Sequence, residues 1–161
     1  MNRVHDLLIK NRVLDLGPLP APRLGPEATL QQALLHLVRG RRGAIVAVEG
    51  LSPVGILTER DLVYHLSDPE FASAEGRRKA ALGDVMSRPP VTVRRQASLL
   101  TAIDTMAQRH HRHLVVVSGQ GELKGLLNTN DLVQFLTDQF PRDVVNLPPR
   151  LHQQYKTIEG A

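Results

Sequence analysis

The residues best placed to do chemistry are a threonine and an aspartate that follow an apolar run. Thr58 directly follows the apolar segment 54–57, and Asp61 comes three positions after Thr58. If a buried strand passes directly into a helix here, both side chains lie at the helix N-terminus, where free N–H groups and the helix dipole favour anions. A carboxylate at this position can accept hydrogen bonds from both hydroxyls of a ribose, and the threonine can donate to a phosphate or to the sugar. The pattern indicates a nucleotide site.

The same two residues also fit a simpler role as the cap of a helix. The segment returns, however, as Gly125–Asp131, with Asn128 at the position of Thr58 and Asp131 at the position of Asp61. Two copies in the same context favour a ligand over a purely structural cap. In the second copy the hydroxyl has become an amide, so we expect the ribose contact to survive there while the phosphate contact changes.

A second candidate is the basic stretch 109–113, which reads Arg-His-His-Arg-His. Its histidines lack the helical spacing and the nearby carboxylate of a metal site, so we expect no bound metal. A solvated basic turn is the simplest interpretation. Phosphate binding by Arg112 and His113 is the functional alternative, because the guanidinium fork matches phosphate oxygens. In the first copy, Arg41 and Arg42 occupy the corresponding break.

Catalytic signatures are missing from the sequence. It has no nucleophile elbow, no glycine-rich phosphate loop ending in Lys-Ser or Lys-Thr, and no metal-ligand spacing. Cysteine is absent, which removes thiolate catalysis and disulfides together. We therefore expect a protein that is not an enzyme and has no catalytic residues.

The composition narrows the class of partner. The chain has 161 residues, 42% of them hydrophobic, which is typical of a globular domain or a fused pair of small ones. Its formal charge of +4 suits an anionic partner. Only five aromatic residues are present and none interleaves with a basic run, so we favour a small phosphorylated ligand over nucleic acid. No apolar run approaches ~20 residues and no signal-peptide core follows the N-terminus, so we expect a cytoplasmic protein without a membrane span.

The elements that must position these residues occur in the same order twice. An extended segment near Pro20–Leu24, a helix capped by Thr29, two apolar strands and a helix through Leu66 make a β-α-β-β-α unit. The order then repeats from Pro90 to Leu136. Ile45–Val48 falls on Leu114–Val117, 69 positions later. A duplication of this kind predicts two half-units that bury their apolar faces against each other.

Each copy of the unit closes on the same motif: a glycine, two aliphatic residues, a polar run and an aspartate, which is Asp61 or Asp131. With this motif, the duplicated unit resembles the tandem cystathionine-β-synthase (CBS) domain pair. The resemblance implies an α/β (α+β) fold of two repeats related by a pseudo-twofold axis, packed as one compact module. The expected boundaries are an N-terminal arm at 1–8, repeats at 9–67 and 78–138, and a C-terminal tail at 139–161.

The resemblance also implies a function: a non-catalytic regulatory module that binds AMP, ADP, ATP or S-adenosylmethionine between the repeats. It requires no cofactor, and Mg²⁺ would enter only together with the ligand. The resemblance further implies a homodimer that signals to a regulated protein partner by a change of conformation or assembly. A ligand-free scaffold and a basic nucleic-acid-binding protein stay open as alternatives.

Carried across residue by residue, the resemblance assigns Asp61 and Asp131 to the ribose and Thr58 or Asn128 to the phosphate or ribose. Arg112 and His113 would complete the Asp61 site across the cleft, and Arg41 or Arg42 would complete the Asp131 site. We expect the Asp61 site to be the tighter one. The backbone around Thr92 and Val93 and the strands at Ile45 and Val46 and at Leu114 and Val115 are expected to frame adenine.

Overall fold

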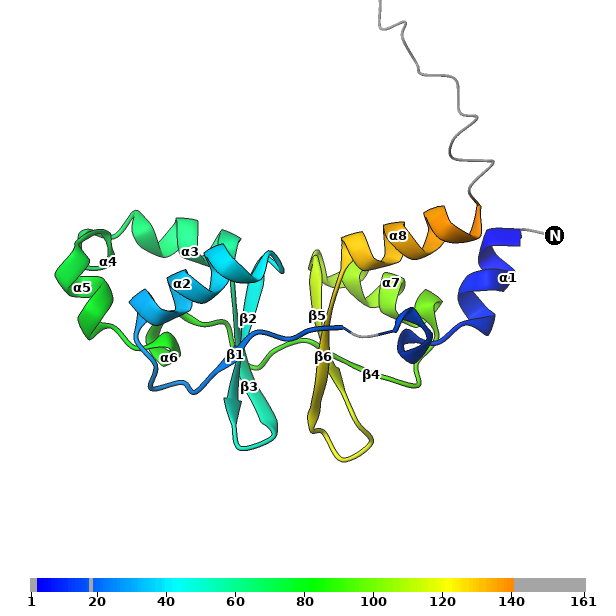
Figure 1. Ribbon diagram of the computed structural model, residues 1–161, viewed down its shortest axis with the longest axis horizontal. Coiled ribbons are helices and arrows are strands. Elements are labelled where there is room, and N and C mark those ends of the chain that lie inside the picture. Colours follow the sequence, from blue (N-terminus) through cyan, green and yellow to red (C-terminus); the bar gives the residue numbers. More distant parts are fainter. Residues whose placement is uncertain (1–2, 18, 141–161) are drawn as a thin grey trace, which may run out of the picture.

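The computed structural model describes residues 3–17 and 19–140 (Figure 1). Over these residues the first half contains β1 (Arg23–Leu24), α2 (Leu30–Gly40), β2 (Ala44–Glu49), β3 (Ser52–Thr58) and α3 (Glu59–Leu66). The second half contains β4 (Thr92–Arg94), α7 (Leu99–Arg109), β5 (His113–Val117), β6 (Leu123–Asn128) and α8 (Thr129–Gln139). The predicted pair of β-α-β-β-α units is confirmed. The expected tail lies outside the described residues after Phe140.

Each half folds its strands into a three-stranded sheet, of order β1-β2-β3 in the first and β4-β5-β6 in the second. In both sheets the short first strand runs parallel to the central strand, which pairs antiparallel with its hairpin partner. The registers correspond, since Ala44 pairs with Thr58 and His113 pairs with Asn128. Each hairpin also shifts register at the corresponding place in its central strand. The duplication thus extends to the irregularities of the backbone.

The two sheets pack face to face at the centre of the molecule, with the helices on the outside (Figure 1). Because side chains alternate along a strand, Val46 and Val115 point into the buried cluster between the sheets, whereas Ile45 and Leu114 point toward the helices of their own halves. Strands covered on both faces require apolar residues at every position. This explains the unbroken apolar runs of β2 and β5.

The helices begin and end at residues that suit their termini. The side chain of Thr29 accepts a hydrogen bond at the start of α2, and that of Ser98 does so at the start of α7. Both helices end in a residue with left-handed backbone, Arg41 at φ 50° and His110 at φ 53°. These two residues are therefore equivalent in the two halves, and the strand that follows each of them begins three positions later.

Packing crosses the boundary between the two sequence repeats. The 3-10 helix η1 (Val13–Leu16) lies ahead of the first sheet, yet the backbone of Val13 and Leu14 bonds to residues 97 and 95 of the second half. Conversely, helix α6 (Leu82–Val85) bonds to residues 26 and 28 and buries its apolar side chains in the core of the first half. Each half is thus completed by a segment that precedes the other half in sequence.

The remaining elements surround this framework. Helix α1 (Arg3–Lys10) packs against α7, so the expected N-terminal arm lies on the second half. The connector near residues 68–78 contains two short helices, α4 (Pro69–Ala72) and α5 (Ala74–Lys79). None of the helices in the described part of the chain is long and apolar enough to cross a membrane.

Candidate functional site

Asp61 lies at the N-terminus of α3, in the corner where β3 ends. Its Oδ2 accepts hydrogen bonds from the backbone N–H of Thr58 at 2.9 Å and from the Thr58 hydroxyl at 2.7 Å. Its Oδ1 accepts from the Ser87 hydroxyl at 3.4 Å. The capping role that the sequence left open is therefore present. It leaves Oδ1 with one long contact, so this oxygen retains capacity to accept further hydrogen bonds.

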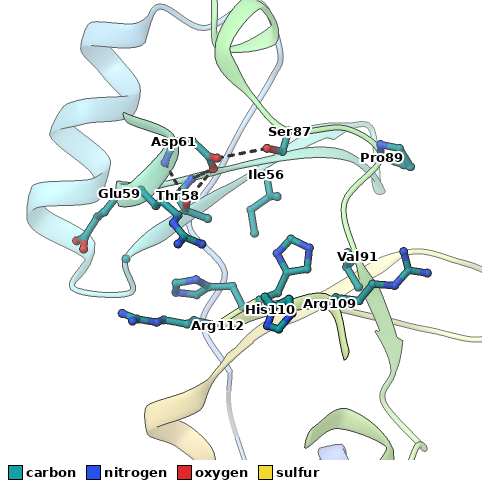
Figure 2. A pocket seen from close by; sticks show the side chains of 14 residues that line it. Ile56, Thr58, Glu59, Asp61, Ser87, Pro89, Val91, Arg109, His110 and Arg112 are labelled. Atoms are coloured by element: carbon teal, nitrogen blue, oxygen red, sulfur yellow. Dashed lines mark hydrogen bonds between the residues drawn. The ribbon is translucent and has the colours of Figure 1, made fainter. Parts of the chain in front are cut away.

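This corner forms one side of a cavity of about 520 Å³ between the two halves. The volume lies within the range of small-molecule sites in proteins. Thr58, Asp61 and Ser87 line one side, and Arg109, His110 and Arg112 line the side opposite (Figure 2). The remaining lining residues are Gly43, Ile56, Glu59, Arg60, Pro89, Val91, His111 and His113.

Charge is distributed unevenly around the cavity. Asp61 and Glu59 supply negative charge at the end of β3, whereas Arg109 and Arg112 supply positive charge from the end of α7 and the following turn. Arg60 adds a third guanidinium. A ligand that donates hydrogen bonds at one end and carries anionic oxygens at the other would match both sides.

His113 enters the cavity wall as a neutral group. Its Nε2 lies 2.9 Å from the carbonyl oxygen of Arg42, so this nitrogen carries the proton and donates it. Burial lowers the pKa of His113, and the positive charge of Arg42 acts in the same direction, against the raising effects of the hydrogen bond and of Glu59 and Asp131. His113 therefore adds no net charge at neutral pH. The positive charge of this wall comes from arginine.

Gly43 lies directly beside the imidazole of His113. It has φ +70°, and a Cβ built on it would lie 3.3 Å from Nε2 of His113. A side chain here would meet the imidazole and would adopt an unfavourable left-handed backbone. The glycine thus lets the two halves approach closely beside the cavity.

The Asp131 corner has the same backbone but a different neighbour. Asp131 accepts from the backbone N–H of Asn128 at 2.8 Å, as Asp61 does from Thr58. Both of its carboxylate oxygens also accept from Arg42, each at 2.8 Å. Nη2 of Arg42, which donates to Oδ2 of Asp131, also donates to the carbonyl oxygen of Leu126. Arg42, expected to reach a bound phosphate, instead pairs with the aspartate itself.

The structure brings together four of the predicted site residues, Thr58, Asp61, Arg112 and His113, at one cavity. It pairs Arg42 with Asp131 at the other corner, beside Asn128. Arg41 is exposed and makes up the left-handed end of α2. None of the residues of the segments expected to frame adenine lines this cavity. The side chains of Val93, Ile45, Val46, Leu114 and Val115 are buried in the cores, and Thr92 is exposed.

Several lining residues, most of them apolar, were not predicted from the sequence. Ile56 precedes Thr58 by two positions and shares its face of β3, a relation that strand alternation could have revealed. Ser87, Pro89 and Val91 belong to the segment between α6 and β4. That segment reaches the first half through a backbone bridge between Ser87 and Ile56. Only the fold, not a local motif, places it there.

Metal binding finds no support in the part of the chain that the structure describes, where no cluster of three or more histidine, cysteine or acidic residues could hold an ion. The histidines at 110, 111 and 113 line the same cavity as Asp61 but do not form such a group. Their place on the wall makes them candidates for contacts with a ligand.

Comparison with known sequences identifies the duplicated unit. The model of the CBS domain family matches residues 17–68 and 82–138. An uncharacterised protein of Methanopyrus kandleri is 31% identical over 93 residues, which are 57% of this chain and 45% of the relative. The chain spans between 33% and 65% of the length of the curated relatives that it matches.

Comparison with solved structures agrees on the fold. The CBS domain protein PAE2072 from Pyrobaculum aerophilum, complexed with AMP, superposes with a TM-score of 0.66 at 24% identity, covering 79% of this chain and 99% of that one. The CBS domain pair of protein MJ0100, in complex with 5′-methylthioadenosine and S-adenosyl-L-methionine, superposes with a TM-score of 0.68 at 15% identity, covering 80% and 98%.

Proposed function

The chain belongs to the CBS domain family, and from this premise we propose that it is a non-catalytic regulatory module that binds an adenosine-containing ligand in the Asp61 cavity. The observation that carries the proposal is the pairing of two chemistries across one cavity. A carboxylate with spare acceptor capacity lies on one side of the cavity, and Arg109, His110 and Arg112 lie on the opposite side (Figure 2). Solved members of the family with this fold carry AMP, or 5′-methylthioadenosine and S-adenosyl-L-methionine.

In this arrangement Asp61 accepts hydrogen bonds from the ribose hydroxyls, and Thr58 supports the aspartate or contacts the sugar. Arg109, Arg112 and Arg60 bind the phosphate oxygens, for which a guanidinium fork is well matched. Ile56 and Val91 offer apolar surface to the adenine ring. These contacts use residues of both halves, so a bound ligand stabilises one relative arrangement of the halves over others.

The charge of the wall favours AMP, ADP or ATP over S-adenosylmethionine. The latter carries a positive sulfonium and an ammonium group, which three arginines would repel. Mg²⁺ would enter only with the phosphates of a di- or triphosphate. We further propose a cytoplasmic location, where adenine nucleotides are abundant, and subcellular fractionation would test it.

We also propose that the chain forms a homodimer through the outer faces of α3 and α8. Val63 on α3 and Val133 on α8 occupy equivalent positions, 72% and 60% exposed, and Tyr64 beside Val63 is 77% exposed. A twofold dimer buries the same patch on both copies, and a patch that is itself repeated within the chain suits that symmetry. Signalling to a protein partner would then act through the dimer.

Isothermal titration with AMP, ADP, ATP and S-adenosylmethionine tests the ligand site. We expect Asp61→Asn to weaken nucleotide binding by about tenfold to hundredfold, because it removes charge-assisted hydrogen bonds to the ribose. Asp104→Asn removes an equal charge from an exposed position on α7 and should leave the affinity unchanged.

Two results would count against the proposal. Wild-type protein that gives no heat and no thermal stabilisation with any of the four compounds would support a ligand-free scaffold instead. Equal affinity of wild type and Asp61→Asn would place the ligand somewhere other than this corner.

A further inference from the structure

Arg42 reaches from the first half into the corner of the second half that is equivalent to the Asp61 corner. It comes from the turn between α2 and β2, and its guanidinium bonds both oxygens of Asp131 and the carbonyl oxygen of Leu126. Both side chains of the ion pair are only 17% exposed. The pair is therefore largely buried where the two halves meet.

The contact that Arg42 makes resembles the contact expected from a ribose. Two N–H donors of the planar fork meet the two carboxylate oxygens side by side, as two vicinal hydroxyl donors would. The guanidinium thus occupies the acceptors on which binding of a sugar at Asp131 would depend. A ligand could use this carboxylate only after Arg42 had left it.

The Asp61 corner shows which residue takes the place of Arg42 in the other copy. Arg41 and His110 are the equivalent left-handed ends of α2 and α7. Two positions later, Gly43 and Arg112 are also equivalent, because each carbonyl accepts a hydrogen bond from the first residue of the helix that follows the hairpin. The donor is the N–H of Glu59 for Gly43 and the N–H of Thr129 for Arg112. Arg42 therefore corresponds to His111.

His111 lines the open cavity, and within the described chain Asp61 takes part in no ion pair. Histidine is shorter than arginine and has no planar fork of donors. The two corners thus share their caps and their aspartates but differ at this one position. One corner faces a cavity, and in the other the carboxylate is held by Arg42.

We propose that Arg42 is a built-in occupant of the Asp131 corner, and that the difference between Arg42 and His111 sets the number of ligands bound per chain to one. The inference rests on the proposed function for the identity of the ligand. It adds that the Asp131 corner is a latent site of the same kind, closed by a side chain of the same molecule.

Exchanging the two residues tests this inference in both directions. Titration with AMP should give about one site per chain for wild type and about two for Arg42→His, which installs the residue of the open corner. His111→Arg should pair with Asp61 and weaken binding by at least about a hundredfold. The double variant should bind one AMP again, now sensitive to Asp131→Asn rather than to Asp61→Asn.

Matched controls separate the pairing from a general effect of charge. Arg39→His removes a charge from an exposed position on α2, and Gln108→Arg adds one at an exposed position on α7. Both should leave the single site of wild type as it is. If Arg42→His does not fold, His111→Arg gives an independent answer, with circular dichroism as the check of its fold.

The outcomes distinguish this inference from the proposed function. One site in both wild type and folded Arg42→His would overturn the inference and leave the proposed function standing. Unchanged binding by folded His111→Arg would do the same. No binding by wild type but one site in Arg42→His would overturn the proposed function and the count of one ligand per chain, and would support the closure of the Asp131 corner by Arg42. No binding by either protein would overturn both.

Discussion

Asp61 and Asp131 occupy the same position in two copies of one motif, yet their carboxylates have different surroundings. Each binds the backbone N–H at the end of the preceding strand. Asp61 then meets two hydroxyl groups, whereas Asp131 meets a guanidinium. The pairing leaves Nε of Arg42 buried without a partner in the described part of the chain. An unsatisfied buried donor costs about 1–3 kcal/mol, so the pair offsets part of its own stabilisation.

His113 provides a prediction about pH at the scale of the residue. Burial lowers its pKa in the folded state, so the unfolded chain binds the proton at a higher pH than the folded protein does. As pH falls below about 6.5, the ordinary imidazole value, the unfolded state gains protons first and the free energy of unfolding decreases. Above that pH both states are neutral and the contribution is fully present.

Urea unfolding at pH 7.5 and pH 5.5 measures this effect. Wild type should lose more stability between the two pH values than His113→Gln, which can donate to the carbonyl of Arg42 but does not titrate. His36→Gln, at an exposed position on α2, should behave as wild type. Equal losses in wild type and His113→Gln would show that His113 does not carry the dependence.

Residue types at fixed spacing were enough to predict part of the site. Thr58 and Asp61 could be predicted because a strand that runs directly into a helix determines where both side chains lie. The pairing of Arg42 with Asp131 could not, because 89 residues separate them and the contact depends on how the halves face each other. The sequence placed Arg42 at the right corner but with a phosphate as its expected partner.

At the scale of the element, the repeat predicted strands and helices well because each carries its own local signal. Helices α2 and α7 have polar caps, and the strands are continuous apolar runs. The positions of η1 and α6 had no such signal. η1 precedes the first repeat in sequence but packs on the second half, and α6 precedes the second repeat but packs on the first. In these positions Val13 and Leu82 become fully buried. This exchange carries Ser87 and Val91 to the cavity.

The outer faces of α3 and α8 give a prediction at the same scale. If the exposed valines form a dimer interface, Val63→Glu with Val133→Glu should convert a dimer into a monomer, because charges would be buried against apolar surface. Sedimentation velocity measures the change in mass. Leu51→Glu is the control, since Leu51 is 58% exposed in the turn between β2 and β3. This turn lies on the side of the molecule away from α3 and α8 (Figure 1).

A monomeric wild type would contradict the proposed dimer. A dimer that persists in the double variant would place the interface on another surface. Neither result bears on the nucleotide site, because Val63 and Val133 do not line the Asp61 cavity.

At the scale of the whole molecule, the duplication yields one scaffold with two unequal corners. The sheets are joined by one buried cluster, so the halves form a common core. The corners lie where α3 and α8 begin, at the same end of that core (Figure 1). A ligand that bridges the Asp61 corner and the arginine wall contacts both halves at once. Such a ligand can shift the balance between arrangements of the halves only by its differential affinity for them.

The most direct test of the account is the crystal structure of the full chain grown with AMP in excess. We predict one AMP per chain, with its ribose hydroxyls within hydrogen-bond distance of Asp61, its phosphate on Arg109 or Arg112, and Arg42 still paired with Asp131. AMP bound at Asp131 with the Asp61 cavity empty would contradict the central claim.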